Sequence, residues 1–166
     1  MRIILVPFED AGQDALDRLA HEISSMTQAE IILSEKTELP NLRWREEQAC
    51  ANDFIPFLME AAAAAGADYA VGITKHDLYD FNNPHAKYLF GFASGNSSII
   101  SSSRLKGDFF LNRLSKEAKH ELGRCLGMSH CDNPKCVMSS PNSVEDIDLK
   151  NRTLCQKCSE KIRSSL

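Results

Sequence analysis

The segment around His120, with the sequence HELGRCLGMSHC, restricts this chain more than any other part of it. His120 and Glu121 stand near the end of an amphipathic stretch, Gly127 is a helix stop signal, and His130 follows it. Side chains at the first and fifth positions of a helix point the same way, and a glycine turn can bring a third side chain back toward them. The fifth position is Arg124, about 40° around the helix from His120, and a guanidinium has no free lone pair for a metal ion. The segment therefore predicts a helix with a metal site in which one ligand position is substituted.

The other residues of this motif suit metal-assisted hydrolysis. Histidines that leave one zinc position open allow the ion to acidify a water molecule, and a neighbouring carboxylate can accept the proton. His120 and His130 are the candidate metal ligands, and Glu121 is the candidate general base. The alternative is that His120 and Glu121 form an ordinary polar pair on an exposed helix face. Gly127 and His130 at the matching offsets favour the metal site.

Four of the six cysteines form two close pairs toward the C-terminal end. Two such pairs joined by a loop are typical of a structural zinc site with four thiolates. The residues after Gly127 include few large apolar side chains, so this segment needs a metal or a cross-link to hold it together. Four buried thiols or two disulfides are the alternatives. The cysteines of this cluster are Cys131, Cys136, Cys155 and Cys158, whereas Cys50 and Cys125 are expected to be small buried side chains.

Hydrophobic patterning predicts an α/β fold with a mixed, twisted five-stranded sheet covered by helices, one of which carries the motif. A Gly95-Asn96 turn should join the last two strands as an antiparallel hairpin. Asp108 is the expected N-cap of the helix that carries His120. The chain should divide into residues 1–127 and a small zinc-stapled subdomain, residues 128–166. The expected strands are 2–8, 29–34, 67–74, 88–94 and 98–103, and the expected helices are 12–26, 48–65 and 108–126.

The composition is that of a globular protein, with 166 residues, 43% of them hydrophobic, and a net charge of −4. The negative charge argues against nucleic acid as a partner. The apolar start of the chain is interrupted at Pro7, too early for a signal peptide or a membrane span. We therefore expect a cytoplasmic monomer without membrane contacts, in which the cysteines serve as thiols or metal ligands.

The order of these motifs resembles that of the archaemetzincins, a branch of the metzincin zinc peptidases. In that family the helix motif is followed by a Cys, a second Cys, a nearby Met and a late Cys-x-x-Cys, as it is here from His120 to Cys158. Other segments also resemble the family, namely 72–74, 77–79, 89–93, 100–101, 104–105 and 116–117. The resemblance covers most of the chain and depends on specific motifs.

The resemblance implies a catalytic zinc on three histidines, a structural zinc on the four cysteines, and a Met-turn at Met138 beneath the active site. It also implies a peptide or protein substrate, which would lie antiparallel along an edge strand within residues 88–93. Arg124 departs from the family pattern, because it replaces the second histidine ligand. Two ligands bind zinc more weakly than three, and a fixed cation opposes a divalent one. The long side chain can turn away to pair with Glu117 or Glu121.

The sequence leaves two functional hypotheses. The first is a zinc-dependent metallopeptidase with Glu121 as general base, a tight structural zinc, and a catalytic zinc that is weak or absent on His120 and His130. The second is a catalytically inactive peptide-binding domain that holds only the structural zinc. Retention of Glu121 and His130 favours the enzyme, and Arg124 favours the binding domain. The remaining histidines, expected at the surface or in hydrogen bonds, are His21, His76 and His85.

Overall fold

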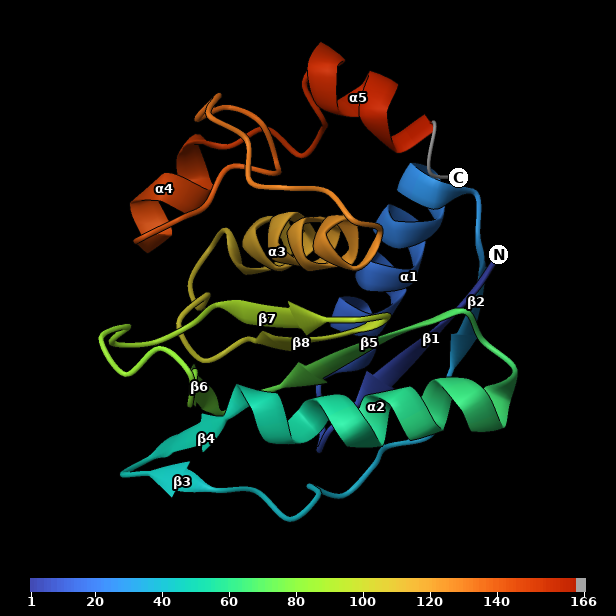
Figure 1. Ribbon diagram of the computed structural model, residues 1–166, viewed down its shortest axis with the longest axis vertical. Helices are drawn as coiled ribbons and strands as arrows, with labels where there is room; N and C mark the ends of the chain where they lie inside the picture. Colours follow the sequence, from blue (N-terminus) through green and yellow to red (C-terminus); the bar gives the residue numbers. More distant parts are fainter. Residues whose placement is uncertain (164–166) are drawn as a thin grey trace.

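The computed structural model describes residues 1–163 and has a five-stranded mixed sheet at its centre (Figure 1). The strands are β1 (Arg2–Pro7), β2 (Glu30–Leu33), β5 (Tyr69–Thr74), β7 (Gly91–Ser94) and β8 (Ser97–Ser101). They follow the order β2-β1-β5-β8-β7, and all pair in parallel except β7, which runs antiparallel to β8 at one edge. The turn of this hairpin includes Gly95, whose φ of 59° lies in the left-handed region that favours glycine. The mixed sheet predicted from the sequence is therefore confirmed.

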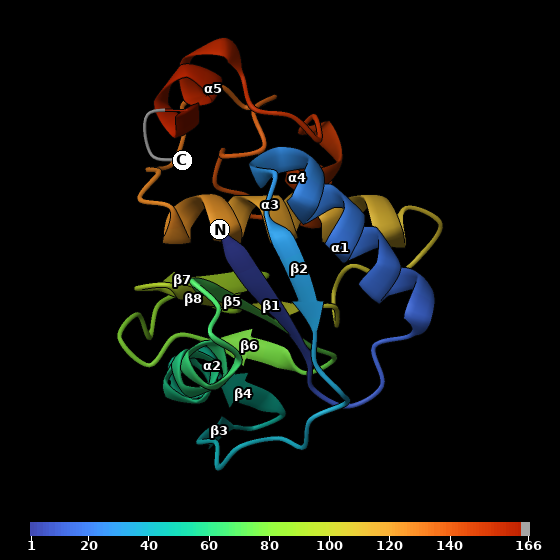
Figure 2. The ribbon, with the colours of Figure 1, turned by 90° about the vertical axis from the view of Figure 1, so that its right-hand side faces the viewer.

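Helices cover both faces of this sheet (Figures 1 and 2). On one face lies α2 (Ala51–Ala65), which contributes the fully buried Phe54 and Leu58 to a hydrophobic cluster with the strands. On the other face α1 (Gln13–Thr27) and α3 (Phe110–Cys125) pack against the strands and against each other. The sheet thus separates α2 from the helix that carries the motif.

A second sheet of three short strands, which the patterning does not predict, is formed by residues between 44 and 79. It consists of β3 (Trp44–Arg45), β4 (Gln48–Cys50) and β6 (Asp77–Tyr79). The predicted helix from residue 48 is wrong at its start, because Gln48–Cys50 pairs antiparallel with β3 and in parallel with β6. Helix α2 begins only at Ala51. Pairing with a strand far along the chain overrides the local helical pattern here.

Helix α3 begins later than predicted, and it is buried on more than one side. Its N-cap is Phe109 without a side-chain hydrogen bond, so the predicted cap at Asp108 is wrong. Every residue from 114 to 123 is buried, including charged residues that are usually exposed on a helix. The cover comes from the C-terminal segment: Lys116 donates a hydrogen bond to the carbonyl oxygen of Ile147 at 2.8 Å. A polar helix face can be buried in this way because its charged groups find partners.

The C-terminal segment crosses α3 on the side away from the sheet (Figures 1 and 2). It contains two short helices, α4 (Val144–Leu149) and α5 (Gln156–Arg163). A capping box of Ser143 and Asp146 begins α4. Buried residues of this segment, such as Val137, join the cluster of α1 and α3. The division at residue 127 stays a prediction, and residues 164–166 of the predicted subdomain lie outside the described residues.

No helix within residues 1–163 combines the length and the apolar character that crossing a membrane requires.

Candidate metal centres

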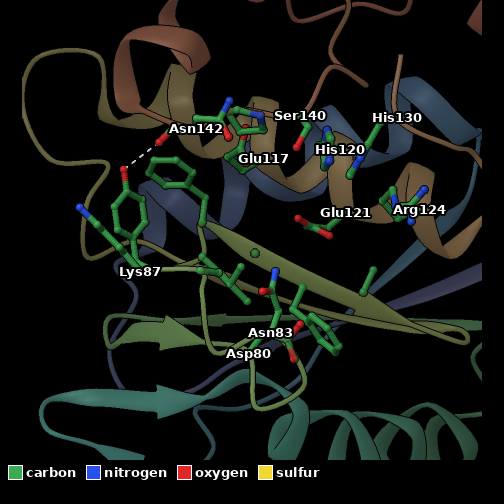
Figure 3. Close-up of a pocket in the computed structure, with 18 of the residues that line it drawn as sticks. Asp80, Asn83, Lys87, Glu117, His120, Glu121, Arg124, His130, Ser140 and Asn142 are labelled. Atoms are coloured by element: carbon green, nitrogen blue, oxygen red, sulfur yellow. Dashed lines mark hydrogen bonds between the residues drawn. The ribbon is translucent and has the colours of Figure 1, made fainter. Parts of the chain in front are cut away.

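A pocket of about 860 Å³ lies between the edge strand β7 and helix α3 (Figure 3). Phe92 and Ala93 line it from the strand, and His120 lines it from the helix. The C-terminal segment contributes Asn142, and the chain between β6 and β7 completes the wall. The fold therefore gathers the predicted helix residues at the open edge of the sheet.

The two candidate histidine ligands lie side by side in this pocket. The ring centroids of His120 and His130 are 5.2 Å apart, and the ring planes differ by 29°. Nδ1 of His120 lies 3.0 Å from the backbone oxygen of Val137, so it carries the proton and donates it, which leaves Nε2 free as a ligand atom. Burial lowers the pKa of His120 to about 3, and burial with the charge of Arg124 lowers that of His130. Both rings are therefore neutral near pH 7, the form that binds a metal ion.

Glu121 faces the same pocket and is only 7% exposed. Burial, reinforced by the neighbouring carboxylate of Glu117, raises the pKa of Glu121 to about 8. Strand β7 approaches the helix closely here, because a Cβ atom on Gly91 would lie 2.6 Å from Cγ of Glu121. Any larger residue at position 91 would displace the side chain of Glu121. Sequence reasoning missed this role, although Gly91 lies within a segment that matches the family.

Arg124 also lines the pocket, one helical turn after His120, but it is held at the end of the helix. Its Nη1 donates a hydrogen bond to the carbonyl oxygen of Met128 at 2.7 Å. Backbone oxygens at a helix C-terminus lack helical partners, so a cation there is favoured. Within residues 1–163, Arg124 forms no ion pair with Glu117, which pairs with Lys150, or with Glu121, so the pairing that its length would allow is not formed.

A buried ion pair lies behind the histidines and joins α3 to the C-terminal segment. Lys150 Nζ lies 3.1 Å from Oε1 of Glu117, and the two side chains are 0% and 1% exposed. Lys116 adds hydrogen bonds to the backbone oxygens of Ile147 and Asp148. Sequence reasoning missed Lys150, because a lysine in an acidic, polar stretch is normally solvated. These contacts fix the helix without a metal ion.

Met138 packs directly beneath the helix motif. A Cβ atom on Gly123 would lie 2.5 Å from Sδ of Met138, so the missing side chain at position 123 makes room for the sulfur. Both residues belong to buried parts of the protein. The assignment of Met138 to a Met-turn stays a prediction.

The four predicted cysteines converge into one cluster. Their Sγ atoms all lie within 4.8 Å of one another, and those of Cys131 and Cys155 are 3.8 Å apart. Four sulfurs bound tetrahedrally at about 2.3 Å from a zinc ion would lie roughly 3.8 Å apart, so the donor set fits zinc. No disulfide joins them, and Cys50 is buried while Cys125 is partly buried. Within residues 1–163, this is the only group of three or more such side chains close enough to share an ion.

The helix site differs, because it brings together two imidazoles and a guanidinium. His120 and His130 supply two nitrogen ligands, and Arg124 cannot supply the third. The residues present therefore fit a zinc ion held weakly on two protein ligands.

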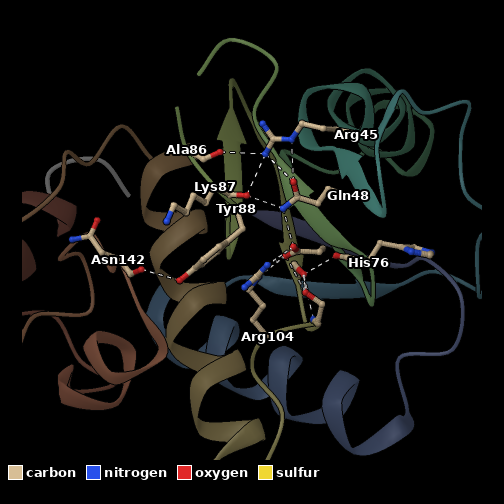
Figure 4. A network of polar contacts seen from close by, with 11 residues as sticks. Arg45, Gln48, His76, Ala86, Lys87, Tyr88, Arg104 and Asn142 are labelled. Carbon is tan, nitrogen blue, oxygen red and sulfur yellow. Dashed lines mark hydrogen bonds and ion pairs between the residues drawn. The ribbon is translucent and has the colours of Figure 1, made fainter. Parts of the chain in front are cut away.

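A network of polar contacts fixes the chain that walls the pocket (Figure 4). The side chains of Arg45 and Gln48 donate to the carbonyl oxygen of Lys87 at 3.2 and 2.9 Å. The hydroxyl of Tyr88 donates to the backbone oxygen of Asn142 at 2.9 Å and so connects this wall to the C-terminal segment. The pocket is thus bounded by fixed elements on both sides.

The remaining histidines do not complete the helix site. His76 contacts Glu9 at 3.1 Å and stacks edge-on against Trp44, and His21 is exposed. His85 lines the pocket, a position for which the sequence offered no signal.

The class of protein that these features indicate is the zinc metallopeptidases. The features are the five-stranded sheet, the motif on α3 and the cysteine cluster. The sequence model of peptidase family M54 matches residues 5–164. An archaemetzincin of Thermococcus kodakarensis is 37% identical over 145 residues, covering 81% of this chain and 76% of the relative. An archaemetzincin of Pyrococcus abyssi is 32% identical, covering 99% of this chain and 95% of the relative. The chain therefore belongs to the archaemetzincins, peptidase family M54.

Solved structures of the family confirm the fold. The crystal structure of archaemetzincin from Methanopyrus kandleri matches with a TM-score of 0.85 at 28% identity, covering 99% of this chain and 94% of that one. The structure from Archaeoglobus fulgidus, solved in complex with malonate, matches with a TM-score of 0.82 at 26% identity, covering 97% and 99%.

Proposed function

We propose that this protein is a zinc-dependent metallopeptidase whose catalytic zinc is held weakly and whose structural zinc is held tightly. The observation that carries the proposal is the shared pocket of His120, Glu121 and His130 at the open edge of the sheet. Arg124 weakens the site, because it removes one ligand and adds a positive charge. The four cysteines hold the structural ion.

The side chains of the pocket have distinct roles in this proposal. His120 and His130 hold the catalytic zinc, and the hydrogen bond from His120 to Val137 fixes the orientation of its ring. When bound, this ion polarises a peptide carbonyl and lowers the pKa of water. Burial raises the pKa of Glu121 to about 8, and the charge of a bound zinc ion would favour its ionised form. The carboxylate would then accept a proton as the general base.

Strand β7 positions the peptide in this proposal. It is the edge strand of the five-stranded sheet and begins at Gly91, later than the predicted residue 88. Gly91–Ala93 of the strand and residues 88–90 before it line the pocket. A peptide added antiparallel to β7 bonds mainly through its backbone, so the pocket tolerates many side-chain sequences. The substrate class is accordingly peptides or unfolded protein segments.

A zinc titration of peptide hydrolysis tests this proposal. Cleavage of a mixed peptide library should rise with added zinc and should disappear in Glu121→Gln, which removes the base but leaves both histidines. The matched control is Glu145→Gln, because Glu145 is a carboxylate outside the pocket. Hydrolysis that is independent of Glu121, or absent at saturating zinc, would contradict the proposal.

A second candidate function is peptide binding without hydrolysis, and Arg124 is the observation that favours it. In that case the pocket binds peptides along β7 while only the cysteine cluster holds zinc. Binding of library peptides without any cleavage, at zinc concentrations that saturate the helix site, distinguishes this function from the first.

A further inference from the structure

The guanidinium of Arg124 has N–H donors that form no hydrogen bond within residues 1–163. One nitrogen donates to the carbonyl oxygen of Met128, and within residues 1–163 no carboxylate pairs with the side chain. Other arginines of the chain are paired at two points: Arg104 with Asp77, and Arg113 with Asp148. A guanidinium has five N–H donors, so Arg124 keeps donors for a ligand.

The carboxylates of the pocket do not neutralise Arg124. Glu117 is committed to Lys150, and Glu121 packs against Gly91. Asp80 accepts a hydrogen bond from the backbone of residue 82 in the loop. Arg124 is exposed, and its hydrogen bond to Met128 fixes where the charge lies. Within residues 1–163, the pocket therefore presents a fixed positive charge that forms no ion pair with a carboxylate.

Arg124 and Lys87 lie at opposite ends of the pocket, with the motif residues between Arg124 and Asn142 (Figure 3). Strand β7 runs beside α3 between these ends. A peptide added to β7 would consequently bring one of its groups next to Arg124. Guanidinium groups bind carboxylates through two parallel hydrogen bonds.

We infer that Arg124 turns this end of the pocket into a carboxylate subsite for bound peptides. The arginine that stands in place of the expected histidine thus replaces a metal-binding side chain with one that binds an anion. This inference rests on the proposed binding of peptides along β7 and does not require hydrolysis. The carboxylate is supplied either by the C-terminus of a peptide or by an acidic side chain.

Calorimetric binding of blocked alanine peptides tests the inference. The probes are acetylated tetra-alanine as the free acid, the same peptide as its amide, and the amide with one alanine replaced by glutamate. We expect the free acid or the glutamate peptide to bind at least about tenfold more tightly than the plain amide. Whichever of the two binds more tightly identifies the source of the carboxylate.

Variants separate recognition by Arg124 from the general charge of the pocket. Arg124→Gln should abolish the preference for the carboxylate, whereas Arg124→Lys should keep part of it because it retains the charge but not the paired geometry. Lys87→Gln, which removes a charge at the other end, is the matched control and should retain the preference.

Three results would overturn the inference. They are equal binding of acid and amide, an unchanged preference in Arg124→Gln, and an equal loss of preference in Lys87→Gln. Loss of thermal stability in Arg124→Gln without a change in peptide preference would show that Arg124 serves only the end of α3. Absence of peptidase activity leaves the inference intact, so its failure and that of the proposed hydrolysis are distinguishable.

Discussion

The cysteine cluster and the helix site both involve the C-terminal segment, but they differ in how complete their donor sets are. The cluster brings together four sulfurs at the spacing that a tetrahedral zinc ion requires. The helix site brings together His120 and His130, with Arg124 where a third ligand would be. One site has every ligand that its chemistry needs, and the other lacks one.

This difference shows which site the fold depends on. Around the helix site, the Lys150–Glu117 ion pair and the hydrogen bonds of Lys116 hold α3 against the segment without any metal. The cysteine cluster joins two stretches of irregular chain, at Cys131 and at Cys155, and both residues pack against the hydrophobic cluster of α1 and α3. We therefore expect the fold to tolerate a lost ligand in the helix site better than a lost thiolate in the cysteine cluster.

The largest expected effect is that of Cys155→Ser. Structural zinc can supply on the order of 10 kcal/mol of apparent folding free energy, so loss of one thiolate should loosen residues 131–163. Amide hydrogen exchange should show lost protection there and normal protection in the five-stranded sheet. Cys50→Ala is the control, because Cys50 is a cysteine outside the cluster. Normal protection of the segment in Cys155→Ser would contradict the role of the cluster.

The second prediction concerns Arg124→His, which supplies the missing ligand and removes the opposing charge. Zinc affinity at the helix site should rise by roughly 100-fold or more, and peptide hydrolysis should increase with it. Arg124→Gln is the matched control, since it removes the charge without adding a ligand. Isothermal titration with zinc measures both variants. Equal affinities in the two variants would show that the missing ligand is not what limits the site.

The third prediction concerns the pH dependence of stability when only the cysteine cluster holds zinc. Glu121 has a pKa of about 8 in the folded protein, above the ordinary value of 4.5, because burial disfavours its charged form. The folded state therefore binds this proton more tightly, and the free energy of unfolding should fall as pH rises from about 4.5 to about 8. Denaturant unfolding of Glu121→Gln should show a flatter profile in that range. A parallel profile would exclude this contribution.

The smallest expected effect is that of Gly123→Ala, which tests the packing beneath the helix site. The added Cβ meets Sδ of Met138, so the free energy of unfolding should fall by about 1–3 kcal/mol. The double variant with Met138→Ala should lose less than the sum of the two single variants, because the clash is removed. Strict additivity, measured by urea unfolding, would show that the two side chains do not interact.

Local patterns explain what the sequence predicted well. The strands of the main sheet and the grouping of the four cysteines follow from short-range periodicity and spacing. Such patterns can be recognised within a single segment, without knowledge of its partners in the fold. Strand β4 was mistaken for the start of a helix, because its partner β6 lies far along the chain. The same reason hid the burial of Lys116 and Glu117, whose partners come from residues 147–150.

The residues of the helix site were likewise predictable only where a local sequence pattern indicates them. His120, Glu121 and His130 were predictable from one motif, and they meet in one pocket. The orientation of the Arg124 side chain was not predictable, because its length permits several hydrogen-bond partners. The partner in the structure is a backbone oxygen, which no side-chain pattern in the sequence indicates. Gly91 carried a similarly weak signal, since its role depends on how closely β7 approaches α3.

Metal analysis of the protein after dialysis against zinc-free buffer tests the central comparison most directly. The complete cysteine cluster should retain its ion, and the two-histidine site should release any zinc it has bound, so we expect one zinc ion per chain. Cys155→Ser should retain less than one, and His120→Ala should leave the value unchanged. Two zinc ions per chain that survive dialysis would show that another ligand completes the helix site and would contradict this account.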